Sequence, residues 1–108
     1  MGEGTFPVFD RAQLERRTLR SPALEVEILA LFVAEAERLL RQVESADDPQ
    51  IRGDRLRAMI ALARHTGAMR LAHVARTLEM EILPTEPDLR PLREALAEAI
   101  AYINGTGV

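Results

Sequence analysis

The chain has 108 residues, no cysteine and a formal net charge of −3, and its 14 basic residues are all arginine. This length corresponds to one domain, which can bury about two-thirds of the surface of its unfolded chain and fold without cross-links. The lack of cysteine excludes disulfides and thiolate metal sites, and the acidic charge with few aromatic residues argues against nucleic-acid binding.

The sequence also lacks two features that would place the chain in or across a membrane. No stretch approaches the ~20 apolar residues of a membrane span. The first residues lack the positive start and apolar run of a signal peptide. We therefore expect a cytoplasmic chain with no membrane partner.

The chain starts with residues 1–8, which we assign to a flexible N-terminal arm, and residues 9–104 form the single helical domain. The first helix is expected to start after Asp10 and to end near Leu19. Asp10 would be its N-cap, Gln13 the return partner of a capping box, and Phe9 with Leu14 a hydrophobic staple.

The second helix is predicted to open at Ser21-Pro22, an N-cap followed by a first-turn proline. Its buried stripe at helical spacing comprises Leu29, Phe32, Val33, Ala36, Leu39, Leu40 and Val43. Ile28 and Leu31 fall outside this stripe. We expect the first helix or the N-terminal arm to cover them, with a partner surface as the alternative.

Two more helices follow the loop at residues 45–49. The third restarts at Asp48-Pro49 and breaks at Gly67, because glycine frees the backbone to turn. The fourth ends at Pro84. Their predicted buried residues are Leu56, Met59, Ile60 and Ala63, then Leu71, Val74, Ala75, Leu78 and Ile82.

The last helix is predicted to start with a second capping box, made of Thr85 and Asp88, and to close at Asn104-Gly105. Its buried residues would be Leu89, Leu92, Leu96, Ala99, Ile100 and Ile103. Four helices with short loops predict an all-α fold, an antiparallel up-down-up-down four-helix bundle with a short N-terminal capping helix.

The middle of the chain carries a family resemblance. Gly67-Ala68 stand ten residues after Arg57, followed by Arg70-Leu71 and Leu78-Glu79. These residues and offsets resemble the histidine-containing phosphotransfer (HPt) domain, whose pattern is His-x-x-Lys-Gly and then Gly-Ala, Arg-Leu and Leu-Glu. The resemblance spans about residues 9–103. It implies a four-helix bundle acting in two-component phosphorelay, with receiver domains and histidine kinases as partners.

The reactive position departs from the pattern. Arg57 stands where the family has its phosphorylated histidine, Ile60 replaces the lysine and Ala61 the glycine. A guanidinium stays protonated and has no free lone pair to attack phosphorus, so Arg57 cannot carry a phosphoryl group. We therefore expect a non-enzymatic binding module without cofactor or metal.

The helical wheel places Arg57, Ala61 and Arg64 on one strip of the third helix. The resemblance implies that this strip docks against the acidic cleft of a receiver domain. Arg57 and Arg64 would then pair with carboxylates of that cleft. The plainer interpretation is that Arg57 is an exposed residue chosen only because it favours helix.

Two alternatives remain open. His65 and His73 are expected to be ordinary surface histidines, but either could be a relocated phospho-acceptor, which would make the chain an active phosphocarrier. The other alternative is a helical interaction or dimerisation domain unrelated to phosphorelay, with Ile28, Leu31 and Met80 at its interface. The expected oligomeric state is a monomer or weak homodimer.

Overall fold

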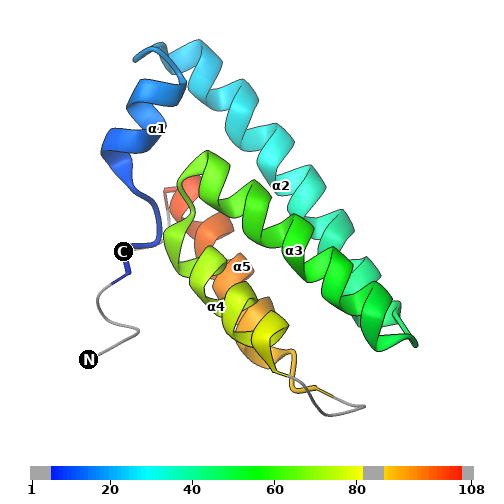
Figure 1. Cartoon of the computed structure of the whole chain (residues 1–108). Helices are drawn as coiled ribbons and strands as arrows, with labels where there is room; N and C mark the ends of the chain where they lie inside the picture. Colours follow the sequence, from blue (N-terminus) through cyan, green and yellow to red (C-terminus); the bar gives the residue numbers. More distant parts are fainter. Residues whose placement is uncertain (1–5, 82–86, 106–108) are drawn as a thin grey trace.

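The computed structural model describes residues 6–81 and 87–105, and within these ranges it contains five helices and no strand. The helices are α1 (Arg11–Arg17), α2 (Pro22–Ser45), α3 (Pro49–Thr66), α4 (Met69–Met80) and α5 (Arg90–Ile103). The predicted all-α fold class is confirmed. Figure 1 shows α3 between α2 and α4, with α5 behind α4 and α1 at one end.

The helix starts follow from local sequence. The side chains of Asp10, Ser21 and Asp48 accept hydrogen bonds from backbone N–H groups in the first turns of α1, α2 and α3. Each of these bonds satisfies a donor that has no partner inside its helix. Pro22 and Pro49 occupy the first positions of α2 and α3, as predicted.

The predicted start of the last helix is wrong in one respect. Asp88 is not helical, and α5 begins only at Arg90. The Asp88 carboxylate accepts from the Arg90 backbone N–H at 3.0 Å and also from its guanidinium, so it caps the helix from two residues away. Thr85, the proposed partner of Asp88, lies outside the described residues.

A single core lies among the helices. α2 packs on α3 and α5, and α4 packs on the same two helices. Every helix contributes a fully buried side chain: Leu14, Phe32, Val43, Met59, Leu71 and Leu92. The predicted buried stripes are confirmed as core or partly buried residues throughout, except for Ile82, which lies outside the described residues.

The α3–α4 turn depends on Gly67. Its φ of 101° lies in the left-handed region, which side chains other than glycine disfavour. The N–H groups of Gly67 and Ala68 both donate to the Ala63 carbonyl, closing the end of α3. The Asp10 backbone lies so close that a Cβ on Gly67 would be 3.4 Å from its carbonyl oxygen.

The position of α1 corrects one expectation. The prediction that α1 or the arm covers Leu31 is wrong, because Leu31 is 71% exposed, while Ile28 is half-buried. α1 packs instead on the end of α3, where Gln13 Nε2 donates to the Arg64 carbonyl at 2.6 Å. This use of Gln13 also replaces its predicted role in a capping box. A helix of seven residues is only ~10 Å long, so it cannot cover both places.

The described part of the N-terminal arm has specific contacts. The ring of Phe6 stacks on His73, and the carbonyls of Phe6 and Pro7 accept hydrogen bonds from Arg70. Val8 packs against the core. The flexibility proposed for residues 1–5 falls outside the described residues.

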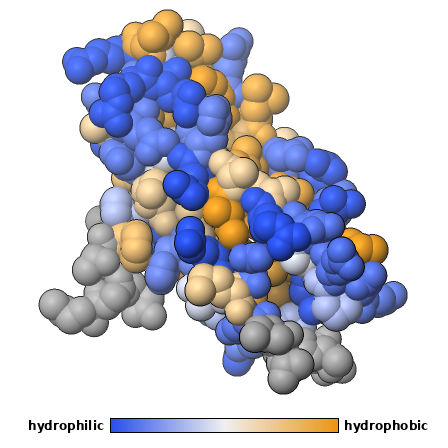
Figure 2. All heavy atoms as spheres, in the orientation of Figure 1, coloured by the Kyte–Doolittle hydropathy of each residue, from blue (hydrophilic) through white to orange (hydrophobic). Residues whose placement is uncertain are grey.

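None of the helices in the described ranges has the length and apolar character needed to cross a bilayer. The face seen in Figure 2 is mostly hydrophilic over α3, and hydrophobic atoms gather at the end where α1 joins α2.

Candidate functional site

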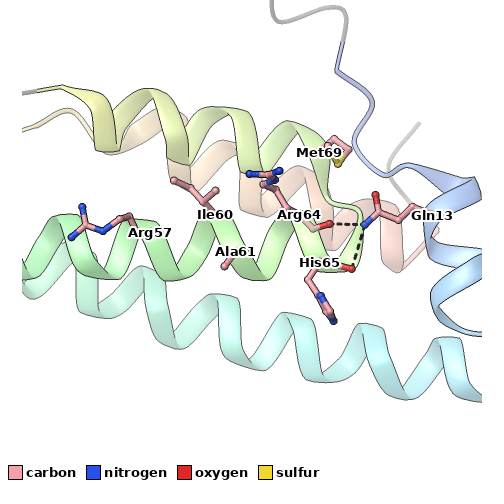
Figure 3. Close-up of a pocket in the computed structure, with 7 residues that line it drawn as sticks. All are labelled: Gln13, Arg57, Ile60, Ala61, Arg64, His65 and Met69. Carbon is pink, nitrogen blue, oxygen red and sulfur yellow. Dashed lines mark hydrogen bonds between the residues drawn. The ribbon is translucent and has the colours of Figure 1, made fainter.

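The predicted strip lies along the exposed face of α3. Arg57, Ala61 and Arg64 are all exposed, and all three line one surface hollow of about 680 Å³. The hollow is completed by Gln13 of α1, by Ile60 and His65 of α3, and by Met69 of α4 (Figure 3). The three helices thus meet beside the strip, which sequence periodicity alone could not show.

Arg57 is already paired within the chain. Its guanidinium donates to Asp54, one turn earlier on α3, and to Glu79 of α4 at 3.0 Å. The hydrogen bonds to Glu79 and then to Asp54 raise the pKa of Arg57 above its ordinary value. The group therefore stays a cation, but two carboxylates surround it and leave the local cluster with a net charge of −1.

Arg64 differs from Arg57 in both direction and pairing. In Figure 3 the guanidinium of Arg64 points toward α4, while that of Arg57 points away along α3. Among the described residues, no carboxylate lies within ion-pair distance of the Arg64 guanidinium. Within residues 6–81 and 87–105, Arg64 is therefore the arginine of the strip whose positive charge has no carboxylate partner.

The surface between the two arginines is small and apolar. Ala61 is exposed and carries only a methyl group, so another molecule can approach the backbone of α3 closely there. Ile60 is partly buried against the core and forms an apolar wall of the hollow. Ile60, which the resemblance places at the family's lysine position, therefore supplies apolar surface and no charge.

His65 is exposed, as predicted, and it is held by α1. Its carbonyl accepts from Arg17 Nε at 3.2 Å, and its Nδ1 lies 3.0 Å from Arg17 Nη2. Because arginine only donates, Nδ1 must be the acceptor, and its lone pair is engaged in this bond. The ring points toward α2 and away from Arg64 (Figure 3).

His73 does not line the hollow. Its ring stacks on Phe6 with the ring centroids 4.3 Å apart and the planes at 17°. The side chain is half-buried under the N-terminal segment. The structure therefore separates the two histidines, and only His65 borders the predicted strip.

The other residues that carry the resemblance build the scaffold around the strip. Gly67 makes the turn, while Ala68, Leu71 and Leu78 are buried. Arg70 forms an ion pair with Glu98 of α5 at 2.7 Å and holds the Phe6 carbonyl. Together with Glu79, the motif residues fix the position of α4 against α3, α5 and the N-terminal segment.

Sequence reasoning missed four residues of this site: Gln13, Met69, Glu79 and Asp54. Gln13 and Met69 reach the hollow through contacts far apart in the sequence, so no local pattern indicates them. Glu79 belongs to the motif that carries the resemblance, but its pairing with Arg57 depends on the packing of α4 on α3. The pairing of Asp54 with Arg57 could have been predicted from the sequence, because residues three apart on a helix are neighbours.

No cluster of three or more histidine, aspartate or glutamate side chains suited to a metal ion occurs within residues 6–81 and 87–105. Searches against family models, curated proteins and solved structures found no match for this chain.

Proposed function

We propose that the chain is an HPt-like module of two-component phosphorelay that binds a receiver domain without carrying phosphate. The proposal includes an up-down-up-down arrangement of α2 to α5 with α1 as the cap, and a cytoplasmic location. The observation that carries it is the exposed position of Arg57 midway along α3, at the offset where the resemblance expects the phosphorylated histidine. No nucleic acid or cofactor enters the proposal.

The chemistry at Arg57 supports binding over phosphotransfer. Phosphotransfer needs a nucleophile with an available lone pair, and a guanidinium has none. The hydrogen bonds to Glu79 and Asp54 hold Arg57 further in its charged form. A phosphoryl group arriving there would also meet two carboxylates, which repel it.

Binding would rely mainly on Arg64 and Ala61. A receiver domain presents clustered acidic residues, which would pair with the guanidinium of Arg64 by charge-assisted hydrogen bonds. Ala61 permits close approach. Arg57 would contribute less, because its guanidinium is already paired with Asp54 and Glu79.

The alternative of an active phosphocarrier gains little support from the two histidines. The Nδ1 lone pair of His65 is engaged by Arg17, which leaves the protonated Nε2 without a lone pair in the neutral ring. His73 is half-buried against Phe6. The alternative of a helical interaction domain is favoured by the exposed Leu31, which is considered below.

The decisive experiment incubates the purified chain with radiolabelled phospho-receivers from its source organism and measures both label transfer and complex formation. We expect a complex with one receiver and no label on the chain. Arg64→Glu should weaken this complex more than Arg57→Glu. Arg76→Glu, an exposed arginine on α4 outside the hollow, is the matched control and should bind normally.

Other outcomes would change the assignment. Label on the chain that is abolished by His65→Ala or His73→Ala would make it an active phosphocarrier. Absence of any complex with every receiver would reject the receiver-binding proposal. Equal weakening by all three arginine variants would reject the strip as the binding surface.

A further inference from the structure

The outward face of the first half of α2 is unusually apolar. Leu31 and Val26 are 71% and 69% exposed. Of the exposed positions between residues 23 and 34, which are Ala23, Val26, Glu27, Ala30, Leu31 and Ala34, only Glu27 carries a charge. A surface helix normally presents charged and polar residues on this side. The face therefore has the character of a contact surface.

A groove lies between α2 and α3, and the exposed Leu31 is one of the residues that line it. Its volume is about 450 Å³, and its apolar lining includes Ile28 and Ala34 of α2 and Leu62 of α3. Its charged members, Glu35 and Arg38, form an ion pair with each other. The same face thus carries a recess of mainly apolar lining and, at that recess, a leucine that is largely exposed.

We propose that this face binds a second copy of the chain, with Leu31 of each copy seated in the α2–α3 groove of the other. A two-fold axis brings one surface patch against the same patch on its partner. Such a patch must be self-complementary. The adjacency of Leu31 and the groove satisfies this condition, because each copy supplies one projection and one recess.

Charge sets the direction of the pairing. Glu27 and Arg38 are eleven residues apart, about three helical turns, so they lie on the same side of α2. An antiparallel pair of α2 helices brings Glu27 of one copy toward Arg38 of the other. A parallel pair would place equal charges together. Within the described residues Glu27 has no ion pair of its own, so it is available for this contact.

This inference does not depend on the proposed receiver binding. His65 borders both the groove and the hollow that contains Arg64, so the two surfaces are neighbours. Failure of receiver binding would leave the proposed dimer unaffected, and failure of dimerisation would leave the receiver-binding strip unaffected.

Sedimentation velocity of the full chain at rising concentration tests the proposal. We expect a shift from one-chain to two-chain mass. Leu31→Asp should weaken this association on the order of 100-fold, because each dimer loses two buried leucines and gains two buried charges. Met80→Asp is the matched control, since Met80 is similarly exposed on α4, and it should associate like the wild type.

Circular dichroism of each variant shows whether its helices are intact. A wild-type chain that keeps one-chain mass into the millimolar range would overturn the proposal. Association that Leu31→Asp leaves unchanged, that Met80→Asp weakens equally, or that continues beyond two chains would also overturn it.

A charge exchange tests the antiparallel direction separately. Glu27→Arg should weaken the dimer because it places a cation near Arg38 of the partner copy. Adding Arg38→Glu to the same chain should restore association, since the pair is then re-formed with opposite signs. A double variant as weak as Glu27→Arg alone would show that the helices do not pair in this direction.

Discussion

Arg57 of α3 and Glu79 of α4 form an ion pair, with 3.0 Å between Nη1 and Oε2. These two residues stand at the two ends of the segment that resembles the HPt pattern. The residue that the resemblance aligns with the nucleophile of that pattern is therefore a cation that links two helices. The same side chain remains 55% exposed, so it is open to a partner at the surface.

Replacing Arg57 with histidine tests whether the register of the resemblance is right. We expect Arg57→His to accept a phosphoryl group from a phospho-receiver, because an exposed imidazole with a free lone pair would then stand at the expected position. Glu79 could hold one ring nitrogen and leave the other reactive. The measurement is an acid-labile, alkali-stable phosphate on the chain.

Arg76→His is the control, since it adds an exposed histidine outside the hollow and keeps Arg64, and it should remain unlabelled. If Arg57→His takes no label from any receiver that binds the chain, the assigned register is wrong.

The helix starts and the α3–α4 turn could be predicted because a few neighbouring residues decide them. Ser21 and Asp48 cap helices that open with proline, and Gly67 alone allows the left-handed turn. The start of α5 could not be predicted as well. The spacing from Thr85 predicts Asp88 at the N3 position of a capping box, but its carboxylate bonds to Arg90 two residues later.

Helical periodicity predicts only the part of the site that lies on one helix. The common exposure of Arg57, Ala61 and Arg64 follows from their spacing on one helix. The hollow beside them does not, because it depends on where α1 and α4 pack. Gln13 illustrates the difficulty, since its side chain could serve its own helix or bond to the end of α3, and only the tertiary structure selects the second.

Truncation of Met59 should be far more damaging than truncation of Met80. Met59 is fully buried in the core, and Met80 is 66% exposed. Met59→Ala leaves a cavity and should lower the free energy of unfolding by about 2–5 kcal/mol. Met80→Ala should change it little. Urea denaturation of both variants makes the comparison, and similar losses would contradict the assigned core.

The pH dependence of Asp88 follows from its contacts with Arg90. The guanidinium, and then the backbone N–H of Arg90, lower the pKa of Asp88 from 3.8 to about 2. Because the folded pKa is depressed, the contribution of this carboxylate to stability is present above pH 3.8 and is lost as the pH falls through about 2. NMR titration of the Asp88 side-chain carbonyl should give this midpoint.

Arg90→Gln should raise the midpoint toward 3.8, because it removes the largest cause of the shift and keeps the backbone hydrogen bond. Arg93→Gln is the control. Its charge acts on Asp88 without a hydrogen bond and should move the midpoint less. A wild-type midpoint of 3.8 would show that the Asp88–Arg90 contact is absent in solution.

Two glycine-to-alanine substitutions should change stability in opposite directions. Gly67→Ala forces a side chain into the left-handed region, at a cost of roughly 1–2 kcal/mol, and places its Cβ 3.4 Å from the Asp10 carbonyl oxygen. Gly53 lies inside α3, where an added Cβ meets only Arg57 Nη1 at 3.7 Å. Gly53→Ala should therefore stabilise the chain by up to ~1 kcal/mol, since alanine favours helix.

Urea denaturation measures both changes under one set of conditions, which makes each variant the control for the other. The sign of the Gly67→Ala effect is the sharper test, because the turn brings Gly67 against the segment that starts α1. A neutral Gly67→Ala would mean that the α3–α4 turn does not require its left-handed residue. A destabilising Gly53→Ala would mean that the start of α3 is packed more tightly than its open surroundings indicate.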